Sequence, residues 1–234
     1  KPYLNITLPI HSDIRHFVSA IEDNLRDNPT IVPSNDALTK RQEWIQRLRK
    51  VCGNYAVKYD DYQLPPPGTG VNPYHFMFAL AEHLKGNHRI ACGDATACIV
   101  PYQILPLSHG QRMFSNSGCA SMGYDLPAGL GAALAAKDYE EGGSTIVLAG
   151  DGSLMMNLQE LQSLASSKLD IVLFILDNNG YLSIKQTQSN FYGREHGASP
   201  RSGVTFPDFA KLAKAFDLPV TLLADHMNME HCLK

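Results

Sequence analysis

The chain of 234 residues lacks a strong excess of charge of either sign. Its 20 lysines and arginines, set against 23 aspartates and glutamates, give a formal net charge of −3. Proteins that bind nucleic acid or anionic membranes rely on a positive excess, so this balance argues against both kinds of partner. No apolar run approaches the roughly 20 residues that cross a bilayer, and no secretory leader opens the chain. We therefore expect a globular, cytoplasmic protein with no nucleic-acid or membrane partner.

The cysteine and histidine spacings of common metal sites are also missing. The 5 cysteines include no C-x-x-C pair, and the 9 histidines include no H-x-x-x-H pair. An odd number of cysteines indicates buried, reduced thiols rather than a disulfide framework. The chain also has no G-x-G-x-x-G after its first strand and no phosphate loop that ends in Lys-Ser or Lys-Thr. These absences argue against a dinucleotide-binding role of the usual kind.

What the sequence does contain is a pair of short apolar runs, each followed by polar turn residues. The runs at 145–149 and 171–176 are β-branched and bounded by turns, which is typical of buried parallel strands. The sequence GDGS follows the first run at 150–153, and DNNG follows the second at 177–180. Ligands of open α/β sheets bind where strands end at the carboxyl edge. We therefore expect the acidic and amide side chains of these turns to converge there.

These residue types suit a hard divalent cation that holds phosphate. Mg²⁺ takes about six oxygen ligands in near-octahedral geometry. The carboxylate of Asp151 and the amide oxygen of Asn178 are ligands of this kind. Gly152 and Ser153 would open the helix that follows, so that their N–H groups and the helix dipole favour an anion. The alternative is that both segments are ordinary turns and helix caps without a ligand.

Strand and helix patterns alternate along the rest of the chain. This alternation predicts an α/β protein with a doubly wound parallel sheet and helices on both faces. An Asn72-Pro73 cap predicts the start of one helix. Further strands are expected at 89–92, 112–114 and 220–223. Further helices are expected at 128–136, after the GDGS turn and at 207–216, and no regular element is expected at 229–234.

The first 70 residues show a different organisation. They predict an edge strand at 1–6, a helix from a Ser12/Asp13 cap through Leu25, and a charged helix from Asn35 that stops at Gly53. One strand and one helix cannot bury a core, so we expect a piece of a longer polypeptide. The Pro/Gly-rich segment 64–70 is the best linker candidate. The expected parts are a domain remnant at 1–30, a helical linker at 31–70 and the main domain at 71–234.

On these motifs the chain resembles the thiamine diphosphate-dependent enzymes. The GDG turn followed by a double asparagine is typical of their diphosphate-binding domain. From about residue 72 to 219 the chain is similar to that domain in acetolactate synthases and related decarboxylases and carboligases. The similarity also rests on Ser117-Gly118, on MGYDLPA at 122–128 and on MNLQEL at 156–161. The first thirty residues resemble the end of the family's central domain, and 31–70 its linker.

The resemblance implies a set of cofactor-binding residues. Mg²⁺ would be bound by Asp151, the side-chain oxygen of Asn178 and the backbone carbonyl of Gly180. Met122 would support the bent form of the cofactor, and Tyr181, Ser183 and Ile184 would border the substrate side. The expected contacts to thiamine diphosphate come from Asp94, Ala95, Thr96, Ala97, Ala120, Ser121, Met122, Gly150, Asp151, Gly152, Ser153, Asn178, Gly180 and Tyr181.

The resemblance also implies an activity. Such an enzyme decarboxylates a 2-oxo acid, here pyruvate, and transfers the two-carbon unit to an acceptor. The glutamate that activates the cofactor lies in a separate domain of the other subunit, in a homodimer or homotetramer. No such domain is visible in this sequence, so we expect it to supply no catalytic residue and to be silent alone. Whether a flavin (FAD) is bound stays open.

Two departures from the acetolactate synthase pattern leave alternatives. Thr96-Ala97 stands where those enzymes place a glutamine-histidine pair, and Thr187 stands near the position of a large aromatic. One alternative is a simple 2-oxo acid decarboxylase or a carboligase with another acceptor, such as a sugar. Another, of a different class, is a non-catalytic nucleotide-binding or assembly module on the same sheet.

Overall fold

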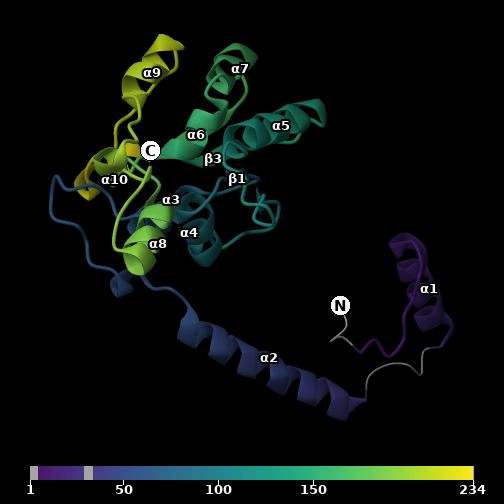
Figure 1. The fold of residues 1–234 in the computed structure, drawn as a ribbon. Coiled ribbons are helices and arrows are strands. Elements are labelled where there is room, and N and C mark those ends of the chain that lie inside the picture. The colour runs from purple at the N-terminus through teal and green to yellow at the C-terminus, as the bar shows by residue number, and fades with distance from the viewer. Residues whose placement is uncertain (1–4, 29–33, 234) are drawn as a thin grey trace. The chain divides into compact units, whose positions relative to one another are not determined.

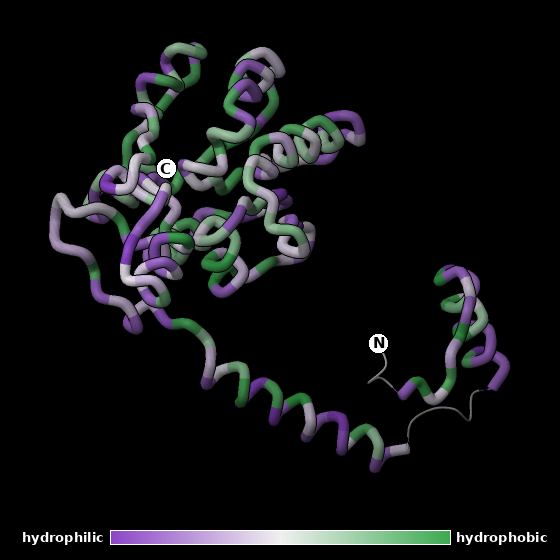
Figure 2. The backbone as a smooth tube through the Cα atoms, in the orientation of Figure 1, coloured by the Kyte–Doolittle hydropathy of each residue, from purple (hydrophilic) through white to green (hydrophobic). Residues whose placement is uncertain are grey.

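The computed structural model describes residues 5–28 and 34–233 of the chain, which divides between Ala56 and Val57 into two compact units. In the first unit, α1 (Ile14–Asp27) begins where predicted, because the Asp13 side chain accepts the Arg15 N–H at 2.9 Å. Helix α2 (Asn35–Tyr55) follows a Ser34 cap. Neither helix has a buried residue, and apolar and hydrophilic residues alternate along α2 (Figure 2).

Two predictions for this unit need comment. The expected stop at Gly53 is wrong, because α2 continues to Tyr55. A glycine costs a helix about 1 kcal/mol relative to alanine but does not forbid another half turn. The edge strand predicted at 1–6 lies largely outside the described residues, and residues 5 and 6 are not in a strand.

The second unit is built on a four-stranded parallel sheet. Its strands are β1 (Arg89–Cys92), β2 (Arg112–Ser115), β3 (Thr145–Gly150) and β4 (Ile171–Leu176), in the order β2-β1-β3-β4. All three pairings are parallel, and β3 pairs with β4 over its whole length. The predicted parallel sheet is therefore confirmed.

Helices connect and cover these strands (Figure 1). As expected, α3 begins at Pro73, where the Asn72 side chain accepts the Tyr74 N–H. The helices are α3 (Pro73–His83), α4 (Thr96–Ile104), α5 (Asp125–Asp138), α6 (Asp151–Leu154), α7 (Glu160–Ser167), α8 (Leu182–Tyr192), α9 (Phe209–Ala215) and α10 (Met229–Cys232). Short 3-10 turns stand at η2 (Tyr59–Asp61), η3 (Met155–Asn157), η4 (Pro200–Ser202) and η5 (His226–Asn228).

Hydrophobic cores lie on both faces of the sheet. On one face, Ile146 and Leu148 of β3 join residues of α3, α4 and α10. On the other, Ala149 of β3 joins residues of α5, α7 and α9. The side chains of neighbouring strand residues point to opposite faces, so β3 contributes residues to both cores and is buried on both sides. The predicted doubly wound arrangement, with helices on both faces, is confirmed.

Predictions at the C-terminal end and for the cysteines were less accurate. Residues 220–223 are not a strand, because β propensity forms a strand only where a neighbour completes the ladder. Residues 229–232 form α10, since Met229 is buried against α3. The five cysteines form no disulfide in the described chain, but only Cys92 is buried. Its burial raises the pKa of the thiol to about 12.

Candidate functional site

The strand order places a crevice at the carboxyl ends of β1 and β3. The loop after β1 leads into α4 on one face of the sheet, and the turn after β3 leads into α6, which belongs to the core on the other face. Connections that leave neighbouring strands toward opposite faces open a gap between their loops. The two segments that the sequence singled out, 94–97 and 150–153, border this gap.

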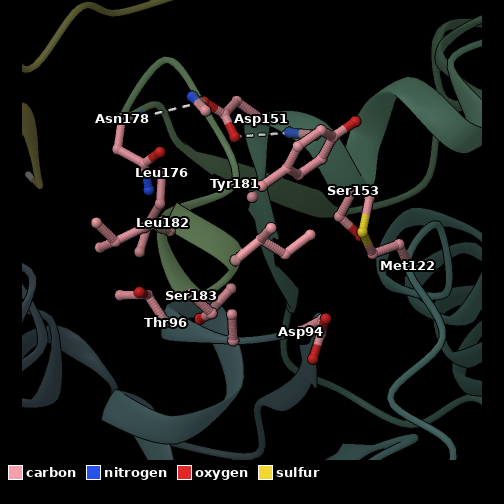
Figure 3. Close-up of a pocket in the computed structure, with 16 residues that line it drawn as sticks. Asp94, Thr96, Met122, Asp151, Ser153, Leu176, Asn178, Tyr181, Leu182 and Ser183 are labelled. Atoms are coloured by element: carbon pink, nitrogen blue, oxygen red, sulfur yellow. Dashed lines mark hydrogen bonds between the residues drawn. The ribbon is translucent and has the colours of Figure 1, made fainter. Parts of the chain in front are cut away.

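Asp151 links the turn after β3 to the turn after β4. Its Oδ2 accepts the backbone N–H of Asn178 at 3.2 Å and that of Gly180 at 3.0 Å, while Oδ1 accepts the Gly152 N–H at 2.6 Å (Figure 3). The residue is only 3% exposed. Burial raises its pKa above the ordinary value, against the lowering effect of these hydrogen bonds. The predicted convergence of Asp151 with the DNNG segment is present.

The hydrogen bonds leave the Asp151 carboxylate with spare capacity. An ionised carboxylate offers about four acceptor positions, and three N–H groups use three of them. Among the described residues, Asp151 forms no ion pair, and the Asn178 side chain makes no hydrogen bond. A buried carboxylate without a positive neighbour is costly, and a bound cation would remove that cost. The donor set therefore fits a hard divalent cation.

Neighbouring groups approach Gly152 and Gly180 in these turns so closely that a side chain would not fit. A Cβ at Gly152 would overlap the Tyr181 ring, and one at Gly180 would lie 2.6 Å from the Ala198 carbonyl oxygen. That carbonyl also accepts the Tyr181 N–H at 2.9 Å. Glycine is therefore required at both positions by the approach of neighbouring groups.

A pocket lies between the loops after β1, β3 and β4. Figure 3 shows Asp94 and Thr96 on the opposite side of it from Asp151 and Asn178. Its walls include the predicted Tyr181, Ser183 and Ile184 from the turn into α8. The lining residues are Asp94, Ala95, Thr96, Ala97, Met122, Gly150, Asp151, Gly152, Ser153, Leu176, Asn178, Gly180, Tyr181, Leu182, Ser183 and Ile184.

Two predicted cofactor contacts do not line the pocket. Ala120 and Ser121 stand in an exposed turn, in which the Ala120 N–H donates to the Asn116 carbonyl at 2.6 Å. Met122, the next residue, does reach the pocket. A helix begins at the GDGS turn as predicted, as α6, but the Gly152 N–H that was expected to face an anion donates to Asp151 Oδ1. The role of the Ser153 N–H stays a prediction.

Backbone strain gathers at the same edge. Ala95 has φ 49° and ψ −122°, and Asn179 has φ 57°. Asparagine tolerates the left-handed region, but alanine with this pair of angles costs of order 1–3 kcal/mol. Strain of this kind persists where the surroundings fix the backbone, and Ala95 lies in the pocket wall.

Sequence reasoning missed three residues here. Leu176 and Leu182 line the pocket, and their positions at a strand end and a helix start could have indicated it. Asp125 is 0% exposed at the start of α5. Its Oδ1 accepts the Leu126 N–H at 2.9 Å, whereas Oδ2 makes no hydrogen bond of normal geometry with the described residues, although the nearby Ser153 hydroxyl acts to lower the pKa of this carboxyl. Burial raises the pKa of this carboxyl above its ordinary value.

Residues 5–28 and 34–233 contain no group of three or more His, Cys, Asp or Glu side chains placed to hold a metal. A site at Asp151 would therefore combine one carboxylate with amide and carbonyl oxygens. None of the helices in these ranges has both the length and the apolar character needed to cross a lipid bilayer.

Comparison with known proteins gives relatives along nearly the whole chain. The acetolactate synthase large subunit of Porphyra purpurea is 38% identical over 227 residues, which is 96% of this chain and 35% of that protein. The acetolactate synthase isozyme 3 large subunit of Escherichia coli (strain K12) is 24% identical over 209 residues, or 89% of this chain and 34% of that protein. The chain thus spans about a third of the length of these relatives.

Solved structures share the fold. A benzoylformate decarboxylase from Polynucleobacter necessarius aligns with a TM-score of 0.63 at 17% identity, over 76% of this chain and 32% of that one. A thiamine diphosphate-dependent 4-hydroxybenzoylformate decarboxylase from Rhodococcus jostii RHA1 aligns with a TM-score of 0.59 at 22% identity, over 74% and 31%. Residues 93–234 match the family described as "Thiamine pyrophosphate enzyme, C-terminal TPP binding domain". The chain therefore belongs to the thiamine pyrophosphate enzymes and carries their C-terminal TPP-binding domain.

Proposed function

We propose that the pocket at the carboxyl edge binds the diphosphate of thiamine diphosphate through Mg²⁺. Asp151 would supply a carboxylate oxygen, Asn178 its side-chain oxygen and Gly180 its backbone carbonyl. The observation that carries this proposal is the hydrogen bonding of Asp151 Oδ2 to the N–H groups of Asn178 and Gly180, at 3.2 and 3.0 Å. These bonds hold the turns after β3 and β4 together at one side of the pocket.

Other pocket residues would complete the cofactor site. The hydroxyl groups of Thr96 and Ser183 are available in the walls, and the Met122 side chain provides an apolar surface. A flexible, polarizable methionine suits an irregular contact with a ring. When bound, the cofactor supplies the carbanion chemistry of 2-oxo acid decarboxylation, while the protein holds and orients it and limits access of water.

For the whole protein, we propose decarboxylation of a 2-oxo acid, namely pyruvate, and transfer of the two-carbon unit to an acceptor. The similarity to proteins named acetolactate synthase supports this reading. The pocket side of α4 begins with Thr96 and Ala97, two small residues, which favours a second candidate: a decarboxylase or carboligase with a different acceptor. Product analysis with pyruvate, alone and with candidate acceptors, separates the two. The cytoplasmic location, the homo-oligomer and any flavin stay predictions.

The cofactor proposal is tested on the 234-residue chain by ¹⁵N NMR. Thiamine diphosphate with Mg²⁺ should shift the amide signals of Gly152, Asn178 and Gly180, and chelation of the metal should reverse the shifts. NMR detects millimolar affinity, which suits a site that a second domain would complete. No metal-dependent shift at these amides would contradict the proposal and favour a non-catalytic module. We further expect no decarboxylation of pyruvate by this chain alone, and measurable CO₂ release would overturn that expectation.

A further inference from the structure

Both backbone polar groups of Gly123 are held by the segment that follows β3. The Gly123 N–H donates to Ser153 Oγ at 2.8 Å, and the Gly123 carbonyl accepts from Asn157 Nδ2 at 2.7 Å. Gly123 is buried, and its φ of 81° lies in the left-handed region. It directly follows Met122, which lines the pocket. Two short hydrogen bonds therefore connect the Met122 loop to the turn that contains Asp151.

No side chain fits at this junction. A Cβ on Gly123 would lie 2.7 Å from Met156 Cβ and 2.9 Å from Asn157 Nδ2. Distances this short are far inside van der Waals contact, so the loop rests directly on η3. On the other side of Met122, residues 117–121 are exposed. Gly123 is thus the buried anchor next to Met122.

The orientation of the Asn157 amide is also fixed. The Gly123 carbonyl can only accept, so the group that faces it is Asn157 Nδ2, and Asn157 Oδ1 is left to accept from Gln159 Nε2 at 3.1 Å. Asn157 is not part of the pocket wall. Any effect of Asn157 on a ligand in the pocket would therefore act through Gly123 and Met122.

We infer that Asn157 and Ser153 form a clamp on Gly123 that sets the position of the Met122 side chain in the pocket. Asn157 is then a positioning residue, which couples the apolar wall to the metal-binding turn. The part of this inference that concerns the cofactor rests on the proposed function. The clamp itself rests on the two hydrogen bonds and on the close contact at Gly123.

The clamp is tested by hydrogen exchange of peptides that cover residues 117–124, measured without any ligand. Asn157→Asp keeps the shape of the side chain but places an acceptor against the Gly123 carbonyl. It should speed exchange in these peptides by about tenfold, as expected for loss of one partly buried hydrogen bond. Asn157→Gln retains a donor and should restore part of the protection. Gln162→Ala is the matched control, because it removes an exposed hydrogen bond from the Gln162 side-chain amide to Ser166 on α7. It should not change the exchange of residues 117–124.

The coupling to Met122 is tested by affinity for thiamine diphosphate and Mg²⁺, from the same NMR titration. Asn157→Asp should weaken binding by about tenfold in the wild-type background and by much less in a Met122→Ala background, because substitutions of residues that act through one another are not additive. Unchanged exchange in Asn157→Asp would overturn the clamp. Faster exchange with unchanged affinity, or equal losses in both backgrounds, would overturn its role in placing Met122. Absence of cofactor binding by the wild type would refute the proposed function and that role, while the exchange result would still decide the clamp.

Discussion

Charged side chains at the two edges of the parallel sheet differ in how they are bonded. At the amino edge, Arg89 donates to Glu141 Oε2 at 3.3 Å, to Thr145 Oγ1 at 3.4 Å and to the carbonyl oxygens of Gly142 and Gly143. At the carboxyl edge, Asp151 and Asp125 are buried and form no ion pair with any described residue, and burial raises the pKa of each. Charges that are paired within the chain stabilise the fold, whereas a buried carboxylate without a partner in the pocket wall, such as that of Asp151, suits a ligand. The contrast separates the structural edge from the binding edge.

Among the substitutions that test this comparison, Asp151→Asn is expected to have the largest effect. Loss of the charge should weaken metal-dependent binding of thiamine diphosphate by about a hundredfold or more, since a charge-assisted ligand contact is worth roughly 3 kcal/mol. The stability of the variant without ligand should change little, because removal of a buried charge offsets the loss of the acceptor for at least one of the three N–H groups. NMR titration and urea unfolding measure the two quantities.

Asp177→Asn is the control for that variant. Asp177 is exposed and adjacent to Asn178, and its Oδ1 accepts the Asn179 N–H at 3.1 Å, a bond that asparagine can also accept. Its affinity should stay within about threefold of the wild type, a difference below 1 kcal/mol. Equal losses in both variants would mean that the general negative potential of the edge matters and the position of Asp151 does not.

At the opposite edge, Arg89→Met should lower the free energy of unfolding by about 1–3 kcal/mol. The change keeps much of the apolar stem but leaves the carbonyl oxygens of Gly142 and Gly143 without their donor. The affinity for the cofactor should not change. A large loss of cofactor affinity without a loss of stability would contradict the assignment of a structural role to the amino edge and a binding role to the carboxyl edge.

Gly152→Ala should cost about 1–3 kcal/mol of stability, because its Cβ would overlap the Tyr181 ring and force it to move. Since Tyr181 lines the pocket, binding should weaken as well. Gly150→Ala is the matched control for stability alone, because Gly150 itself lines the pocket; its φ is −85° and an added Cβ would meet no described atom within 4 Å. Equal losses of stability in both variants would show that the contact with Tyr181 is unimportant.

The smallest effect is expected for Asp125→Asn and depends on pH. Burial raises the folded-state pKa above the ordinary 3.8, so the native state keeps a proton that the unfolded chain has released. Stability is therefore lost as pH rises from that value through the raised pKa, at about 1.4 kcal/mol per unit of difference. Asparagine cannot ionise, so the variant should be more stable than the wild type at neutral pH and lose this advantage in acid. Urea unfolding across this range checks it, and an unchanged pH slope would contradict the account.

Much of the fold could be predicted because β1, β3 and β4 carry their own signals. Their short β-branched runs end in turns, and the structure places them as adjacent parallel strands. Residues 220–223 show the limit of this reasoning, since a β-rich run without a neighbouring edge remains outside the sheet. Met229 shows the reverse: burial against α3, which no local pattern reveals, gives the last residues a helix.

For the site, the sequence predicted that the two turns meet, but it did not predict the contacts around them. Asp151 and Asn178 were expected together because parallel strands end at one edge. The Asn157 bond to Gly123 could not be expected, since it joins residues 34 positions apart through a loop without regular structure. The same is true of Asp125, whose burial depends on how α5 packs on the strands.

The most direct test of the central claim is a crystal structure with thiamine diphosphate in which Mn²⁺ replaces Mg²⁺. An anomalous difference map should show the metal within about 2.0–2.3 Å of the Asp151 carboxylate, the Asn178 side-chain oxygen and the Gly180 carbonyl. A metal bound elsewhere, for instance at Asp94 or Asp177, would contradict the assignment of the carboxyl-edge site to Asp151.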